Sequence, residues 1–243
     1  MPDAHDDLRV ASYNIHKGVG TDRRRDLGRT AAVIAEIGAD ILALQEADRR
    51  FGRREGLLNL EALRHDLGLI PVPVQGVTDT AHGWHGNMLL VRDALIHEVH
   101  QLKLPGLEAR GALVTDMEVA GRPLRVIAAH LGLLPASRRA QAQALLEKIA
   151  GMEDRPTLLM GDFNEWRAGP GSSLAQLTPR FLPPQSVRSF PARYPILALD
   201  RMMTCRLGEL RDFAAHDTPL ARKASDHLPI KAWLRLQGSG QAA

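Results

Sequence analysis

The chain has 243 residues, of which 44% are hydrophobic and 24% charged, a balance that excludes a wholly disordered chain. Its single cysteine, Cys205, excludes an intrachain disulfide and a zinc site built on cysteines. The formal net charge of +3 favours an anionic partner, whereas aromatic residues at 4% disfavour a stacking platform for single-stranded nucleic acid. A polar, acidic start and the lack of an apolar run of about 20 residues predict a cytoplasmic protein without a signal peptide or transmembrane segment.

The predicted elements follow one another along the chain without strict alternation. Short runs rich in branched and aliphatic residues predict eight strands, at residues 8–14, 40–45, 86–91, 112–119, 124–130, 157–160, 197–204 and 228–236. Apolar residues at helical spacing predict three helices, one on Leu27, Ala31, Ile34 and Ile37, one on Leu60, Leu63 and Leu67, and one that starts at the N-cap Ser137 and buries Ala142, Leu145, Leu146 and Ile149. Strands outnumber helices, which predicts mixed sheets with helices on the outside.

These elements predict a single domain over residues 8–236. The sequence shows no internal repeat and no long linker. The proline-rich stretch 169–193 is interpreted as an irregular excursion, because strand-like sequence resumes after it. Residues 1–7 and 237–243 are polar or rich in small residues, and we expect them to form flexible tails.

Several predicted strands end in the same way, with a carboxylate, an amide or a histidine after the apolar run. The residues at these positions are Asn14, Glu46, His130, Asp162 with Asn164, and Asp200, and Asp226 with His227 precedes the last strand. Polar groups at strand ends can converge through loops on one site. Each also has an ordinary structural alternative, such as a helix cap, an Asx-turn or a salt bridge. A serine triad within residues 225–227 is excluded, because neighbours on an extended chain point to opposite faces.

The order of these motifs is more specific than any one of them. Asn14, Gln45-Glu46, Gly86-Asn87, His130, Gly161-Asp-Phe-Asn164, Asp200 and Ser225-Asp-His227 occur in the order that resembles the endonuclease/exonuclease/phosphatase superfamily, which includes deoxyribonuclease I. The resemblance runs from Val10 to about Leu234 and looks closest to a bacterial branch whose substrate is not established. It implies an α/β fold of the deoxyribonuclease I type, a four-layer α-β-β-α sandwich of two packed mixed sheets.

The resemblance also implies a divalent metal ion, Mg²⁺ or alternatively Mn²⁺. Its expected ligands are Glu46, Asn14 and Asp226, and oxygen ligands of this kind suit a hard cation. His16 stands where several relatives carry an acidic residue, which argues against a second carboxylate-rich metal site. We therefore expect one ion per catalytic cycle.

The remaining site residues receive roles in phosphoester hydrolysis from the same resemblance. Asp162 would orient or deprotonate the attacking water, and Asn164 would donate a hydrogen bond to a phosphoryl oxygen. His227, held by Asp200, would contact the phosphoryl group. His130 is a further catalytic candidate, and the expected substrate-binding residues are Asn87, Arg110 and Lys17. The sequence leaves open whether Asp162 or His227 is the general base.

Together these observations predict a metal-dependent phosphodiesterase that cleaves a phospholipid headgroup or another phosphorylated substrate by in-line attack of water. The alternatives are a nuclease acting on DNA or RNA and, from a different class, an idle phosphate-binding or membrane-surface adaptor. Arginine clusters at 23–25, 49–50, 53–54 and 138–139 form either a rim for a polyanion or an ordinary solvated surface. Trp84 and Trp166 could contact a substrate or pack locally, and we expect the protein to be a monomer.

Overall fold

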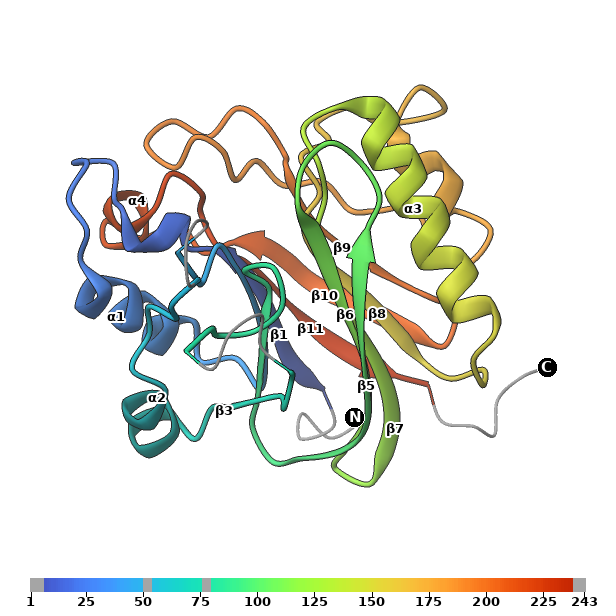
Figure 1. Cartoon of the computed structure of the whole chain (residues 1–243), viewed down its shortest axis with the longest axis horizontal. Helices are drawn as coiled ribbons and strands as arrows, with labels where there is room; N and C mark the ends of the chain where they lie inside the picture. Colours follow the sequence, from blue (N-terminus) through green and yellow to red (C-terminus); the bar gives the residue numbers. More distant parts are fainter. Residues whose placement is uncertain (1–6, 50–53, 76–79, 238–243) are drawn as a thin grey trace.

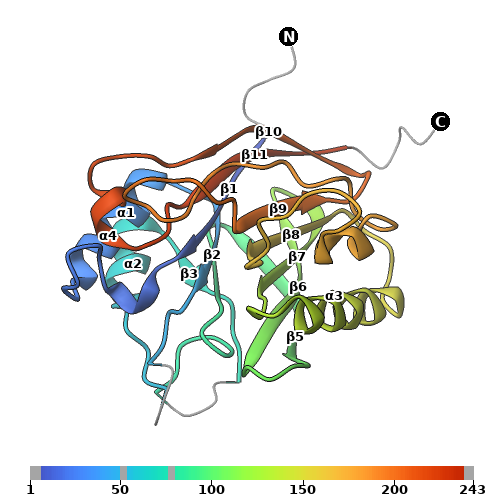
Figure 2. The same ribbon diagram turned by 90° about the horizontal axis from the view of Figure 1, so that it is seen from above.

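Two mixed β-sheets pack face to face, and helices cover both outer faces (Figures 1 and 2). The computed structural model describes residues 7–49, 54–75 and 80–237. In Figure 2, α1, α2 and α4 lie on one side of the paired sheets and α3 lies on the other. The four-layer α-β-β-α sandwich expected from the motif order is confirmed.

The first sheet has the strand order β10-β11-β1-β2-β4-β3. Its strands are β1 (Leu8–Asn14), β2 (Ile41–Gln45), β3 (Ile70–Pro71), β4 (Met88–Val91), β10 (Gly208–Ala215) and β11 (Ile230–Leu236). Strands β1 and β2 are parallel, whereas the other neighbours are antiparallel. The sheet therefore combines strands from both ends of the described chain.

The second sheet has the strand order β5-β6-β7-β8-β9. Its strands are β5 (Ala94–Leu104), β6 (Arg110–Val119), β7 (Arg122–His130), β8 (Thr157–Asp162) and β9 (Asp200–Thr204). Only the β7–β8 pair is parallel. All five strands come from the middle of the chain, so this sheet is continuous in sequence.

Side chains that alternate along each strand separate three apolar cores. Val10 of β1 points between the sheets and packs with residues such as Met160 of β8. Tyr13 of the same strand points to the outer face of the first sheet, towards α1. On the outer face of the second sheet, Leu159 packs with Leu145 of α3. The central strands of each sheet are thus buried on both faces.

The helices begin and end where local signals dictate. Asp26 caps α1 (Leu27–Ile37) and Asn59 caps α2 (Leu60–Leu67), each by accepting a backbone N–H, and a left-handed glycine follows each helix. The third helix, α3 (Pro135–Ala150), begins two residues before Ser137, so the predicted N-cap is wrong. Pro135 occupies the first turn, where its fixed φ suits a helix start. Shorter helical segments are α4 (Ala221–Ala224), η1 (His16–Gly18) and η2 (Ser173–Leu177).

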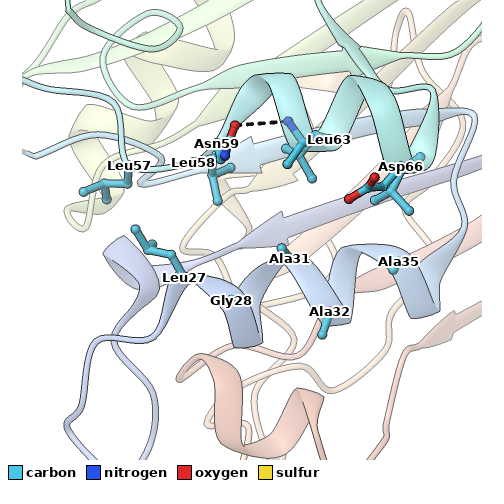
Figure 3. Close-up of a pocket in the computed structure, with 12 residues that line it drawn as sticks. Leu27, Gly28, Ala31, Ala32, Ala35, Leu57, Leu58, Asn59, Leu63 and Asp66 are labelled. Carbon is cyan, nitrogen blue, oxygen red and sulfur yellow. Dashed lines mark hydrogen bonds between the residues drawn. The ribbon is translucent and has the colours of Figure 1, made fainter.

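An apolar groove of about 460 Å³ runs between α1 and α2 on the outside of the first sheet (Figure 3). Small residues of α1, among them Gly28, Ala31 and Ala35, leave this space open. None of the predicted site residues lines the groove.

The predicted tails fall mostly outside the described residues, because residues 1–6 and 238–243 are not among them. At their borders, the carboxylate of Asp7 accepts two hydrogen bonds from Arg235, and the backbone N–H of Gln237 donates to Leu207. Residues 50 and 53 of the arginine clusters also lie outside the described ranges. Across the described residues, no helix has the length and apolar character needed to cross a membrane.

Candidate active site

Strand direction brings the predicted site residues to one edge of the sandwich. The carboxyl ends of β1, β2, β7 and β8 carry or precede Asn14, Glu46, His130 and Asp162. The amino ends of their antiparallel neighbours reach the same edge, so Asp200 of β9 pairs in register with Asp162. The structure therefore brings together residues that are far apart in sequence, such as Asn14 and Asp162, which are 148 positions apart.

Asp162 lies at the centre of the site and is fully buried. Its Oδ2 accepts a hydrogen bond of 2.9 Å from Nδ2 of Asn14 and lies 3.3 Å from Nε2 of His130. Nε2 of His227 is 3.8 Å from the same oxygen. Burial acts to raise the pKa of Asp162, but the charge of His227 and the hydrogen bonds from His130 and Asn14 outweigh it and hold that pKa well below its usual range. Asp162 is therefore an ionised acceptor at neutral pH.

His227 is held by a second buried carboxylate. Its Nδ1 lies 2.9 Å from Oδ2 of Asp200, which also accepts a hydrogen bond from the hydroxyl of Ser189. The ring of Phe190 packs against the imidazole, with 4.8 Å between centroids. Burial alone lowers the pKa of His227, but the charges of Asp200 and Asp162 outweigh it and raise that pKa to about 10. His227 is accordingly an imidazolium with one nitrogen fixed by Asp200.

The three expected metal ligands offer oxygen atoms on the first sheet. Glu46 follows β2 and pairs with the ammonium of Lys17, which lowers the pKa of Glu46 against the opposing effect of burial. Oδ1 of Asn14 accepts the backbone N–H of His16, which fixes the orientation of its amide. Asp226, 37% exposed at its side chain, lies 3.5 Å from Nδ1 of His16. Lys17 shows that a cation is accommodated against Glu46, and the oxygen donors suit a hard divalent ion.

Another acidic and histidine cluster has potential metal-binding atoms within 4.8 Å of one another. It consists of Asp162, Asp200 and His227. A histidine must be neutral to ligate a metal, whereas His227 is protonated between the two carboxylates. The two carboxylates of this cluster therefore hold a protonated His227, and the expected oxygen ligands Glu46, Asn14 and Asp226 remain a prediction.

One cation and two amides complete the predicted set. Arg110, at the start of β6, is buried against Glu108 and places one guanidinium nitrogen 2.7 Å from Nε2 of His130. Nδ2 of Asn164 donates one of its two N–H groups to the carbonyl of Leu131. Both N–H groups of Asn87 are engaged with backbone carbonyls, and its buried Oδ1 has no partner among the described residues.

Left-handed backbone conformations recur at this edge. Glu46 has φ 55°, and Asn164 has φ 50°, which is uncommon for residues other than glycine. Gly161 has φ 152°, and a Cβ there would lie 1.8 Å from the carbonyl oxygen of Ala129. The strand β8 therefore approaches β7 too closely for any side chain at position 161. Such strain concentrates where the surrounding fold holds functional side chains in place.

Several contributors to the site were not predicted from the sequence. Ser189 lies in the proline-rich excursion and donates to Asp200. Glu165, directly after the Gly161–Asn164 motif, forms a buried ion pair with Arg138 at 3.2 Å. The arginine cluster at 138–139 is thereby split, because Arg138 is buried and Arg139 is exposed.

The loop residues that the sequence left open also find partners. Arg54 forms an ion pair with the buried Asp48 and lies 3.0 Å from Nδ1 of His85. Trp84 packs against the inter-sheet core and donates its indole N–H to the carbonyl of Leu102, which is local packing. Trp166 is 55% exposed next to the site.

The model of the Endonuclease/Exonuclease/phosphatase family matches residues 11–227. The chain belongs to this family. It is 30% identical to the uncharacterized protein YbhP of Escherichia coli strain K12, over 97% of this chain and 100% of that protein. The resemblance drawn from the motif order is confirmed.

Solved structures of family type share this fold. The mannosyl-6-phosphatase Bt3783 of Bacteroides thetaiotaomicron superposes with a TM-score of 0.73 at 19% identity, covering 93% of this chain and 99% of that one. TDP2 of D. rerio in complex with a single-strand DNA product superposes with a TM-score of 0.70 at 16% identity, covering 96% and 99%. The family comprises phosphoester hydrolases that depend on divalent metal ions, and this member is a hydrolase of phosphoester bonds.

Proposed function

We propose that this member of the Endonuclease/Exonuclease/phosphatase family is a Mg²⁺-dependent phosphodiesterase that works by in-line attack of water. The observation that carries the proposal is the arrangement around Asp162, an ionised buried carboxylate within 3.8 Å of His227 and 3.3 Å of His130. An acceptor for a water proton thus lies beside two donors for a phosphoryl group. This combination is what hydrolysis of a phosphoester requires.

The proposed metal ligands are Glu46, Asn14 and Asp226. A bound Mg²⁺ would neutralise charge on the phosphate and stabilise the leaving oxygen. Lys17 pairs with Glu46 in this structure. Its ammonium would be available to a phosphate oxygen if Glu46 held the metal ion instead. Mn²⁺ is the alternative ion, since it accepts the same oxygen ligands.

We assign the general base to Asp162 and the phosphoryl donor to His227. Asp162 has a pKa well below its usual range and therefore accepts hydrogen bonds from water at neutral pH. His227 has a pKa raised to about 10, so its Nε2 carries a proton that it can direct at a developing negative charge. Asp200 keeps the ring oriented through Nδ1 at 2.9 Å. Asn164, His130 and Arg110 supply further donors towards the same region, while Asn87 supports the loop that faces them.

The charge balance of the site favours a diester over a monoester. Lys17 is paired with Glu46, Arg110 is paired with Glu108, and His227 lies between two carboxylates. Apart from the charge of a bound metal ion and of the Lys17 ammonium that it would release, little net positive charge remains for a dianionic monoester, whereas a diester carries a single negative charge. We further propose that the enzyme acts as a cytoplasmic monomer.

Hydrolysis of bis-p-nitrophenyl phosphate, compared with that of p-nitrophenyl phosphate, tests the proposal. We expect Mg²⁺-dependent turnover of the diester that exceeds turnover of the monoester, and a loss of about 10²-fold or more in Asp162→Asn. Asp212→Asn, an exposed change on β10, serves as the control. An absence of turnover with both esters and all metals would instead support the adaptor alternative.

A further inference from the structure

Exposed apolar side chains gather on the loops that surround the active site. Six of the ten large hydrophobic side chains that are exposed in the described structure lie there, and we call them the apolar rim: Leu107 (88% exposed), Leu133 (61%), Leu134 (48%), Trp166 (55%), Tyr194 (68%) and Ile196 (66%). They belong to the loops between β5 and β6, after β7, after β8 and before β9. These loops lie along the upper edge of the molecule in Figure 1. Clustered exposure of this kind marks an interaction surface.

Polar contacts hold two of these loops together. Gln141 of α3 accepts the N–H of Gly132 and donates to the carbonyl of Pro105, each at 2.8 Å. Glu108 accepts the N–H of Leu133 at 2.9 Å, and Arg138 donates to the carbonyl of the same residue. The loops that carry Leu107 and Leu133 are therefore neighbours, and the fold fixes their backbone.

The loop before β9 is anchored on the other side of the site. Ser189 donates to Asp200, and the N–H of Ala192 donates to the carbonyl of Asp226 at 2.7 Å. Tyr194 and Ile196 follow within a few residues and point into solvent. The apolar rim thus has members on both sides of the catalytic residues.

Exposed arginines alternate with the apolar side chains. The guanidinium of Arg167 lies 5.3 Å from the ring centroid of Trp166, and that of Arg193 lies 5.8 Å from the ring of Tyr194. Arg139 and Arg188 are exposed on the adjoining segments. None of these four arginines forms an ion pair within the described ranges of the chain. The surface therefore combines exposed apolar side chains with arginines that form no ion pair among the described residues.

We propose that the apolar rim docks on an anionic phospholipid bilayer and presents the active site to lipid phosphodiesters. Leucine and aromatic side chains enter the boundary between headgroups and acyl chains, while arginines contact anionic headgroups. The substrate class, a phospholipid at the interface, rests on the proposed phosphodiesterase function. Trp166 and Tyr194 carry rings, but the four aliphatic members of the apolar rim offer none for stacking on a base, which disfavours a single-stranded nucleic acid as the occupant.

Sedimentation of the full chain with vesicles tests the docking directly. The vesicles are phosphatidylcholine alone or phosphatidylcholine with phosphatidylglycerol. We expect binding to the anionic vesicles that weakens with salt, and at least about tenfold weaker binding in the triple variant L107S/L133S/W166S. Leu95→Ser removes a leucine that is 60% exposed on β5, at the end of that strand far from the rim, and should bind like the wild type. R167Q/R193Q should reduce both binding and its salt dependence.

Turnover of soluble bis-p-nitrophenyl phosphate separates the two proposals. The rim variants should keep wild-type turnover of this small diester and wild-type melting temperatures, and lose hydrolysis of vesicle phospholipid. If the wild-type protein hydrolyses the soluble diester but does not bind vesicles, the docking surface is overturned. Equal vesicle binding by L95S and the triple variant would overturn it as well. Either result leaves the proposed phosphodiesterase function intact. Vesicle binding without turnover would overturn the enzymatic proposal alone. Stronger binding of a single-stranded oligonucleotide, weakened by the same rim variants, would assign the surface to nucleic acid instead.

Discussion

Asp200→Asn tests the chemistry of the site most directly, because it keeps the side-chain volume and removes one negative charge. That charge lies 2.9 Å from Nδ1 of His227 and, with Asp162, raises the pKa of His227 to about 10. Without the charge of Asp200, the charge of Asp162 opposes the effect of burial less strongly than the two charges together did, so the pKa of His227 falls. For every pH unit above the new pKa, the protonated fraction drops about tenfold.

The measurement is kcat/KM for bis-p-nitrophenyl phosphate at saturating Mg²⁺, followed from neutral into alkaline pH. Wild-type activity should persist until the pH approaches about 10, where the imidazolium loses its proton. Asp200→Asn should move this alkaline limb to lower pH. His227→Ala should cost about 10²-fold or more at all pH values, the usual scale for a lost donor or acid–base group. The double variant should be little worse than His227→Ala, because the two residues act as one unit.

Stability should follow the same linkage. A histidine whose pKa is raised by folding stabilises the fold fully below its unfolded value of about 6.5. This stabilisation disappears as the pH rises through about 10 in the wild type. In Asp200→Asn the loss should occur at lower pH, as thermal melts across the same range would show. The exposed Asp212→Asn should change neither profile. An unmoved alkaline limb in Asp200→Asn, or additive losses in the double variant, would refute the pairing.

Three further predictions concern the metal ligands, a buried ion pair and a close backbone approach. Excess EDTA should abolish turnover, and Glu46→Gln should weaken Mg²⁺ binding by about tenfold or more in calorimetric titration; an unchanged affinity would place the ligand elsewhere. Arg138→Met should lower the free energy of unfolding by about 3 kcal/mol in urea titrations, because it leaves the buried carboxylate of Glu165 without its ion-pair partner. The exposed Arg139→Met should change the free energy of unfolding little. Equal effects of the two substitutions would contradict the burial argument. Gly161→Ala should destabilise the fold by about 2 kcal/mol or more, because its Cβ meets the carbonyl of Ala129; a wild-type melting temperature would disprove this contact.

Sequence patterns predicted the buried strands and missed three at the edges. β3, β5 and β10 lie at the margins of the two sheets. Leu95 of β5 is 60% exposed, and most of its neighbours on that strand are only partly buried. An edge strand has one partner and a solvated face, so it needs fewer apolar residues, and the pattern that identifies a strand is weakened. The edge strand β9 was predicted because it is buried along its whole length.

Asp200 was expected at the end of a strand and is instead the first residue of β9. Asn14, Glu46, His130 and Asp162 were predictable because they stand at or directly after the carboxyl ends of strands that reach one edge. Ser189 and Glu165 were not, since neither residue type nor spacing indicates a partner far away in the chain. For Arg138 the sequence does carry a signal, which is its position in the helical pattern. Arg138 lies four positions before Ala142 and seven before Leu145, which places it on the buried face of α3. Arg139 lies three and six positions before the same residues and falls outside that face. Helical spacing therefore distinguishes the structural arginine from its exposed neighbour.

The path of the chain through the two sheets has a consequence for folding. β1 lies between β2 and β11, and β11 follows every strand of the second sheet in sequence. During synthesis, β1 therefore has a pairing partner on one side only. Its second partner, β11, is made after all strands of the second sheet and after β10. His227 is added with this closing step, as the last of the proposed catalytic groups. Since long-range strand pairing is slow, a nascent chain would hold Asp162 and Asp200 in place well before it could hydrolyse anything.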